Sequence, residues 1–239
     1  MKGHFIPEMK ERKIPSERDQ KIYQKAKEDL LDFLYGGITG RFQIAGHRLI
    51  SKWAQPYASG GFVLEIGSGH GHHLKYSKQE YKHYIGLDLE SRFLSNLHHR
   101  YPEACLVNGD AYALPFRDKS MDCILAVYTF EHLRSLPRCL DEIHRILKPD
   151  GMLLVGLPAE GGLLYGLGRH LSSRPYMQRK YGIDYDAIVQ WEHWNTCNEC
   201  IAALHDKFKI LKVRYIPFLI PSIHFNIILI MKLIPKYEA

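Results

Sequence analysis

Short apolar segments recur along this 239-residue chain and alternate with segments of helical periodicity. The apolar segments cover 62–66, 83–89, 104–110, 121–128 and 152–157. Between them, 72–81, 91–100 and 136–147 have the pattern of helices. Buried strands joined by helical crossovers are typical of a parallel sheet. We therefore expect an α/β fold of the Rossmann-like, doubly wound type.

Two further helical patterns precede the first of these strands. Ser16 is a suitable N-cap, and apolar residues then follow at helical spacing until Gly36 and Gly37 end the helix. A second helix should run from Phe42 and end before Pro56. We expect residues 1–60 to form a loose arm of about 15 residues and a helical cap. This cap either lies over a substrate site or only covers the sheet.

The alternation is interrupted after the fifth strand. Residues 159–195 are rich in glycine and basic side chains, and a connection of this length predicts a lid or a binding loop. A helix to Phe208 and a strand over 209–216 follow. The apolar stretch 225–231 is most simply a last, antiparallel strand, with a surface-bound helix as the alternative. The main domain is then 61–239, a seven-stranded sheet with a lid-like insertion at 159–195.

The most informative local motif joins the first strand to the next helix. Gly67, Gly69 and Gly71 follow the strand, and such a turn builds the cofactor crevice of a doubly wound sheet. A dinucleotide-binding motif requires its third glycine where His72 stands. Glu65 also precedes the first glycine by two residues, and a carboxylate suits a cationic ligand better than a pyrophosphate.

This motif resembles motif I of the class I S-adenosylmethionine (SAM) methyltransferases, of the methyltransferase type 11 kind. The segment Arg-Ile-Leu-Lys-Pro-Asp-Gly-Met-Leu at 145–153 is also similar, and the resemblance covers 61 to about 158. It implies an enzyme with SAM as cofactor. Acidic residues at the ends of the second and third strands fit the same family. By this resemblance the cofactor-binding residues are Glu65, Gly67, Ser68, Gly69, Gly71, Asp88, Leu89, Asp110, Ala111 and Tyr128.

A hydroxyl acceptor would require a base, and histidine titrates near neutral pH. His132 follows the fourth strand, and His193 lies in the Trp-Glu-His-Trp segment of the insertion. Each is a candidate catalytic base, and the alternative for each is a structural histidine with a satisfied hydrogen bond. Cys197 and Cys200 have the spacing of metal ligands, but no second pair accompanies them, so we predict no metal.

Composition and charge indicate which kinds of binding partner and which compartment to expect. The net charge of +6 permits a phosphate-bearing partner or a membrane surface without requiring either. Five cysteines without framework spacing, and no signal peptide, predict a cytoplasmic protein. The apolar stretch 216–235 contains prolines and polar residues, so we expect at most peripheral membrane contact through it. We expect no nucleic-acid partner, because no Asn-Pro-Pro-Tyr-type motif follows the fourth strand. The oligomeric state is not indicated.

The resulting functional hypothesis is O-methylation of a small or carrier-linked acceptor. The segment 158–195 resembles methyltransferases of bacterial surface-glycan and antibiotic pathways, which favours a glycan or secondary-metabolite acceptor. Arg169, His170 and Arg174 would then meet a phosphate-bearing acceptor. The apolar C-terminal segment favours instead a quinone or lipid acceptor. A third hypothesis is a catalytically silent SAM-binding protein, because an intact glycine motif argues for cofactor binding but not for transfer.

Overall fold

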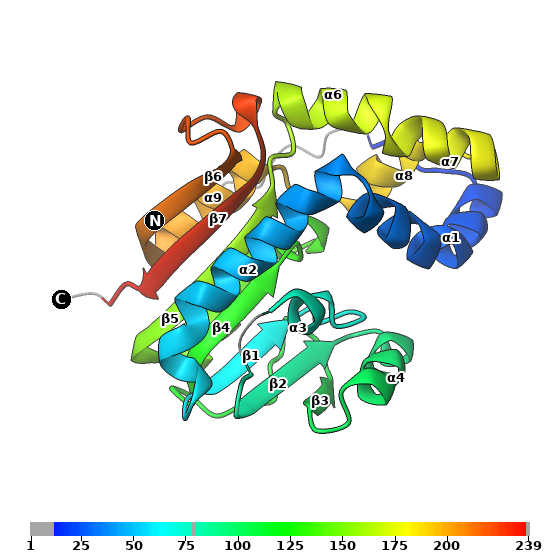
Figure 1. The fold of residues 1–239 in the computed structure, drawn as a ribbon. Coiled ribbons are helices and arrows are strands. Elements are labelled where there is room, and N and C mark those ends of the chain that lie inside the picture. Colours follow the sequence, from blue (N-terminus) through cyan, green and yellow to red (C-terminus); the bar gives the residue numbers. More distant parts are fainter. Residues whose placement is uncertain (1–11, 78–79, 238–239) are drawn as a thin grey trace, which may run out of the picture.

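The structure, a computed structural model, describes residues 12–77 and 80–237. These residues contain a seven-stranded sheet with the strand order β3-β2-β1-β4-β5-β7-β6 (Figure 1). The first five strands pair in parallel, and β7 is antiparallel to both of its neighbours. The Rossmann-like fold expected from the alternating pattern is confirmed. The strands are β1 (Phe62–Ile66), β2 (His83–Asp88), β3 (Cys105–Asn108), β4 (Met121–Val127), β5 (Leu147–Pro158), β6 (Phe208–Pro217) and β7 (Asn226–Pro235).

Helices cover both faces of the sheet. On one face α2 (Ile38–Ala58) packs Ile50 and Ala54 against apolar side chains of β1, β4, β5 and β7. On the other face, α5 (Leu136–Ile146) and α9 (Cys197–Lys207) bury their apolar sides against the same strands. Side chains alternate between the two faces of a strand, so strands buried on both faces are apolar at nearly every position. Shorter helices α3 (His72–Tyr76) and α4 (Ser91–Arg100) follow β1 and β2.

The glycine-rich insertion after β5, expected to be a lid or a binding loop, is helical, and its role as a lid stays a prediction. It forms α6 (Leu163–Leu171), α7 (Ser173–Tyr181) and α8 (Tyr185–Glu192), while the cap contributes α1 (Glu17–Gly36). Tyr23, Ala26 and Leu30 of α1 form a small apolar core with residues of α7 and α8. Helix α1 of the cap and the insertion therefore form one helical layer, which lies beyond the carboxyl ends of the strands (Figure 1), whereas α2 lies along the sheet.

Several predicted boundaries are wrong in detail. The second helix continues through Pro56 to Ala58, because a proline in the last turn removes only one hydrogen bond and Ala58 is buried in tertiary contacts. The helix expected over 72–81 ends at Tyr76, and residues 78–79 lie outside the described part. The fifth strand, expected over 152–157, begins earlier, at Leu147, with an irregularity in its pairing with β4. Most of the expected N-terminal arm, residues 1–11, is likewise outside the description.

The apolar C-terminal stretch is a strand, as the simpler interpretation predicted. β7 lies between β5 and β6, and most of its side chains are buried. The strand itself therefore offers no surface for membrane contact. The connection that precedes it, over 218–225, is largely exposed. Across residues 12–77 and 80–237, no helix has the length and apolarity needed to cross a bilayer.

Candidate active site

The glycine turn after β1 leaves one stretch of backbone open. Gly67, Gly69 and Gly71 have φ values of 71°, 50° and 78°, a region that side chains with a Cβ rarely adopt. A Cβ on Gly67 would lie 2.6 Å from Cγ2 of Thr129, and one on Gly71 would lie 2.5 Å from Cδ1 of Leu97. A Cβ on Gly69 would meet nothing within 4 Å. Two glycines therefore allow close packing, and Gly69 leaves space for a bound molecule.

Asp88, at the end of β2, holds this turn in place. Its Oδ2 accepts a hydrogen bond from the Gly69 amide at 2.9 Å, and its Oδ1 accepts one from the Glu90 amide, also at 2.9 Å. Asn108 at the end of β3 donates from Nδ2 to the carbonyl oxygens of Asp88 and Leu89 at 3.0 and 2.9 Å. Sequence reasoning missed Asn108, although it directly precedes the Gly109-Asp110 pair.

The neighbouring strand ends add an exposed apolar group and a second carboxylate. Leu89 is 70% exposed, and Asp110, next to Ala111, is exposed with its Oδ1 accepting from the Tyr112 amide at 2.9 Å. Because β1, β2 and β3 are neighbours in the sheet, Gly69, Asp88 and Asp110 follow one another along the edge formed by the carboxyl ends of these strands. Ligands of open α/β sheets bind at this edge. The open backbone, the carboxylates and the apolar surface fit the amino, hydroxyl and ring groups of SAM.

Three other predicted cofactor residues lie differently from what the motif implied. Glu65 is 2% exposed and accepts a hydrogen bond from the Tyr84 hydroxyl. Burial raises the pKa of Glu65 to about 8, although the Tyr84 hydrogen bond opposes this shift. Glu65 thus retains its proton near neutral pH, and the charge expected of it is suppressed. Ser68 is buried, and its Oγ has no partner among the described residues. Tyr128, at φ 58°, directs its hydroxyl to the Gln43 carbonyl of α2 at 3.3 Å.

The two candidate bases, 61 residues apart in the sequence, meet in the structure. His132 belongs to the short helix η1 (Phe130–His132) after β4, and His193 directly follows α8. Their rings make an edge-to-face contact with centroids 4.7 Å apart. Nδ1 of His193 is hydrogen-bonded to Oε2 of Glu160, and Nδ1 of His132 lies 3.9 Å from Oε2 of Glu192.

The surroundings shift the pKa values of the two rings in opposite directions. Burial lowers the pKa of His193, but the Glu160 hydrogen bond and nearby carboxylates outweigh burial and raise it. Desolvation and then the charge of His193 lower the pKa of His132. Burial raises the pKa of Glu131 to about 7, and its Oε2 has no partner among the described residues. At neutral pH His132 is a neutral ring, whereas His193 readily takes up a proton.

Three carboxylates of this cluster, Glu131, Glu160 and Glu192, were missed from the sequence. A signal existed, because both histidines occur in Glu-His pairs, at 131–132 and 192–193. Glu192 accepts hydrogen bonds from the Tyr23 hydroxyl at 2.9 Å and from Nζ of Lys27 at 3.0 Å. The cap helix α1 therefore helps to build the cluster.

The expected phosphate-binding cations are already engaged. Arg174 lies 3.0 Å and Arg169 3.6 Å from the carboxylate of Asp186, so one acid neutralises part of their charge. Cys197 and Cys200 are buried free thiols in the core. In the described part of the chain, no group of three or more His, Cys, Asp or Glu side chains could hold a metal ion.

Known proteins resemble this chain in the sequence of its central segment and in its fold. A family profile described as a methyltransferase domain matches residues 64–155. Malonyl-[acyl-carrier protein] O-methyltransferase of Pectobacterium atrosepticum is 31% identical over 119 residues, which are 50% of this chain and 46% of that protein. Fatty-acid O-methyltransferase of Mycolicibacterium smegmatis is 37% identical over 108 residues, 44% of this chain and 39% of that protein. The match thus spans less than half the length of either relative.

The fold likeness extends further than the sequence likeness. The crystal structure of the N-methyltransferase NodS from Bradyrhizobium japonicum, in complex with S-adenosyl-L-homocysteine (SAH), superposes with a TM-score of 0.62. It covers 90% of this chain and 99% of NodS at 15% sequence identity. At that identity the likeness concerns the fold alone.

The protonation of Glu65 gives a first prediction. The pKa of Glu65 is about 8 in the folded protein and 4.5 in the unfolded chain. Between these two pH values the folded protein keeps a proton that the unfolded chain has released. Wild-type stability therefore falls as pH rises from 5 to 8 through this group. Glu65→Gln keeps an acceptor for Tyr84 and does not titrate. Between pH 5 and pH 8, the free energy of unfolding of Glu65→Gln should therefore rise relative to that of the wild type by on the order of 3 kcal/mol.

Urea unfolding of both proteins at pH 5 and pH 8 measures this difference. The contribution of Glu131 is present in both proteins and cancels. Glu90→Gln, at an exposed site, serves as the matched control and should show no such change. An equal difference between Glu65→Gln and wild type at the two pH values would contradict the assignment.

Proposed function

We propose that this chain, whose residues 64–155 form a class I SAM-dependent methyltransferase domain, methylates an oxygen atom of a small or carrier-linked acceptor. The family expected from the glycine motif is confirmed by the profile match, and SAM is the cofactor of that family. When bound, SAM supplies a methyl group activated on a sulfonium. The observation that carries the proposal for oxygen is the Glu160–His193 pair beside His132.

The histidine cluster is physically connected to the glycine turn. Oγ1 of Thr129 donates to the Ile66 carbonyl at 3.1 Å, and the Thr129 side chain fills the space beside Gly67. His132 follows three residues later, with its amide donating to the Thr129 carbonyl at 3.0 Å. An acceptor held under the helical layer would therefore lie close to both the turn and the histidines. Such placement supplies orientation and excludes water, two large contributions to methyl transfer.

His193 has the arrangement of a general base. Glu160 holds Nδ1, so Nε2 is the nitrogen left to take a proton from an acceptor hydroxyl. The carboxylate stabilises the imidazolium that forms, as its effect on the pKa indicates. The proton moves from the acceptor oxygen to Nε2 of His193 as the oxygen attacks. His132 packs against the edge of this ring and limits its rotation.

The names of the relatives support a broad class of acceptor and not one particular molecule. The two relatives described above are named as O-methyltransferases, one for a malonyl group on an acyl-carrier protein and one for fatty acids. These names favour oxygen and a carrier-linked or lipid acceptor. A carboxylate acceptor is already ionised and needs no base, whereas a hydroxyl does. The silent SAM-binding alternative predicts cofactor binding without transfer.

Incubation with methyl-labelled SAM and fractionated cell extract tests the proposal. Label should appear in an acceptor fraction, and alkaline hydrolysis distinguishes a methyl ester from a methyl ether. Binding of SAM by calorimetry without any labelled fraction would favour the silent alternative. Label in nitrogen- or carbon-linked methyl groups would contradict O-methylation.

The open space at Gly69 gives a matched pair of variants. Gly69→Val directs a branched side chain to where the cofactor should approach, so binding of SAH should be lost. Gly182→Val is the control, because Gly182 also has a positive φ, 65°, and nothing within 4 Å of a Cβ, yet it ends α7. Both should lose on the order of 1–2 kcal/mol of stability through backbone strain. Calorimetry showing equal SAH affinity in the two variants would remove Gly69 from the site.

The pH dependence of transfer distinguishes the two histidines. A base must be unprotonated, so kcat should rise with pH through an apparent pKa above the ordinary 6.5 of histidine if His193 acts. Glu160→Gln should move this rise to lower pH. His193→Ala should lower kcat by about 10²–10⁴-fold, while SAH affinity and the His205→Ala control stay unchanged. A profile flat between pH 6 and 8 fits His132, whose pKa is lowered, or an acceptor needing no base, and contradicts the role of His193.

A further inference from the structure

Helix α6 presents a row of apolar side chains to solvent, while Leu164 and Tyr165 of the same helix pack against the core. Leu163, Leu167 and Leu171 are 72%, 53% and 69% exposed. Their spacing of four residues places them in one stripe along the helix. A helix on a globular protein normally turns such a stripe inward, so this outward stripe indicates that something other than water contacts it.

The connection between β6 and β7 adds a second exposed apolar segment. Phe218, Leu219, Ile220 and Phe225 are between 50% and 73% exposed. Nδ2 of the buried Asn226 donates to the carbonyl oxygens of Ile220 and Ser222, at 2.9 and 2.7 Å, so this part of the connection has a defined shape. We call the α6 stripe together with residues 218–225 the apolar edge surface.

The two parts of the apolar edge surface are neighbours. The start of α6 packs on the short helix η2 (Ile223–Phe225), so closely that a Cβ on Gly162 would lie 2.2 Å from the Ile223 carbonyl oxygen. Helix α6 follows the carboxyl end of β5, and the connection follows the carboxyl end of β6, which runs parallel to β5. Both therefore lie at the same edge of the sheet as the glycine turn, at the top of Figure 1.

The charge near the α6 stripe is mostly positive. Residues 161–183 contain no Asp or Glu but carry Arg169 on α6 and Arg174, Arg179 and Lys180 on α7, whereas residues 218–225 contain no Asp, Glu, Lys or Arg. On α7, Lys180 is paired with Asp29 of α1, and Arg174 shares Asp186 with Arg169. Arg179 is exposed, and no described residue makes an ion pair or hydrogen bond with it. The α6 part of the apolar edge surface is thus bordered by positive charge in excess of the acids that pair with it.

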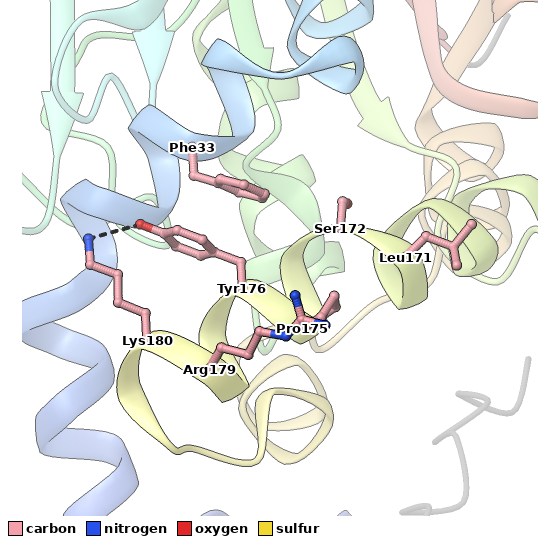
Figure 2. A pocket seen from close by; sticks show the side chains of 7 residues that line it. All are labelled: Phe33, Leu171, Ser172, Pro175, Tyr176, Arg179 and Lys180. Carbon is pink, nitrogen blue, oxygen red and sulfur yellow. Dashed lines mark hydrogen bonds between the residues drawn. The ribbon is translucent and has the colours of Figure 1, made fainter.

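A pocket of about 500 Å³ lies at the α7 end of the stripe (Figure 2). Leu171, Pro175 and the stacked rings of Phe33 and Tyr176, whose centroids are 4.0 Å apart, give it apolar walls. Arg179 and Lys180 also line it, and Lys180 donates to the Tyr176 hydroxyl at 3.1 Å. An apolar wall next to a cation suits the junction between an acyl chain and an anionic headgroup.

We propose that the apolar edge surface docks on the surface of an anionic phospholipid bilayer. The leucine stripe and residues 218–225 would enter the boundary between headgroups and acyl chains, and Arg179 would contact headgroup phosphates. Apolar groups bordered by cations are the combination that interfacial segments use. Docking would face the carboxyl edge of the sheet toward the lipid, so an acceptor carried in the membrane could reach the histidine cluster. That consequence rests on the proposed methyl transfer, whereas the docking itself does not.

Co-sedimentation with vesicles, without any methyl donor, tests the docking separately from catalysis. The wild type should bind vesicles of phosphatidylcholine with one quarter phosphatidylglycerol, and bind pure phosphatidylcholine several-fold less. The double variant Leu163→Ser/Leu167→Ser should lower the partition coefficient by about tenfold or more. Arg179→Ala should lower it about fivefold on the anionic vesicles and little on the neutral ones.

Phe62→Ser is the matched control. Phe62 is 46% exposed at the amino end of β1, the opposite edge of the sheet, and its loss should leave binding unchanged. Circular dichroism verifies that each variant is folded. Wild-type binding that is absent, or that survives the double leucine variant, overturns the proposal. Sedimentation velocity without lipid tests whether a second copy of the chain occupies this surface instead. A wild-type dimer that Leu163→Ser/Leu167→Ser converts to monomer would identify the surface as an interface between copies and would also overturn the proposal.

Discussion

Strand β1 pairs in parallel with β2 on one side and with β4 on the other, and the rest of the site depends on this pairing. The chain runs from β1 to β2 and β3 and then crosses back to β4, so the strand order reverses between β1 and β4. In such a sheet the ligand crevice lies outside the carboxyl ends of the strands at this point. Because Gly67 follows β1 and Thr129 follows β4, the two segments contact each other directly. The glycine turn and the histidine cluster consequently share one edge.

The helical layer completes the site from distant parts of the chain. Tyr23 and Lys27 of α1 bind Glu192 at the end of α8, and the backbone amides of Trp194 and Asn195 donate to the Glu131 carbonyl. These contacts fix the segment that carries His193 against both the cap and η1. The cap therefore does more than cover the sheet, because it supports residues of the candidate site. The exposed leucine stripe of α6 belongs to the same layer.

The sequence predicted features whose cause is local. The buried strands, the N-cap at Ser16 and the glycine turn after the first strand follow from periodicity and residue type, and all appear in the structure. The sheet edge that carries Asp88 and Asp110 followed from the strand order that such an alternation adopts. The assignments of cofactor residues and of the two bases remain predictions, although the structure brings His132 and His193 together.

Features that depend on distant contacts could not be predicted. Glu160 is 33 residues from the histidine it binds, and Tyr23 is 169 residues from Glu192. The protonated state of Glu65 depends on its burial and on Tyr84 from the neighbouring strand. The helical state of 163–192 was missed because its glycines weaken the helical pattern, while packing of α7 and α8 on α1 supplies the stability.

Hydrogen–deuterium exchange with and without SAH tests most directly whether the carboxyl edge of the sheet is the cofactor site. The account predicts slower exchange of backbone amides at 67–71, 88–90 and 110–112 when SAH is present, because a bound ligand suppresses local opening. The edge strand β6 should exchange at an unchanged rate, since it lies at the far end of the sheet. Protection that appears elsewhere, with the glycine turn unaffected at saturating SAH, would contradict the account.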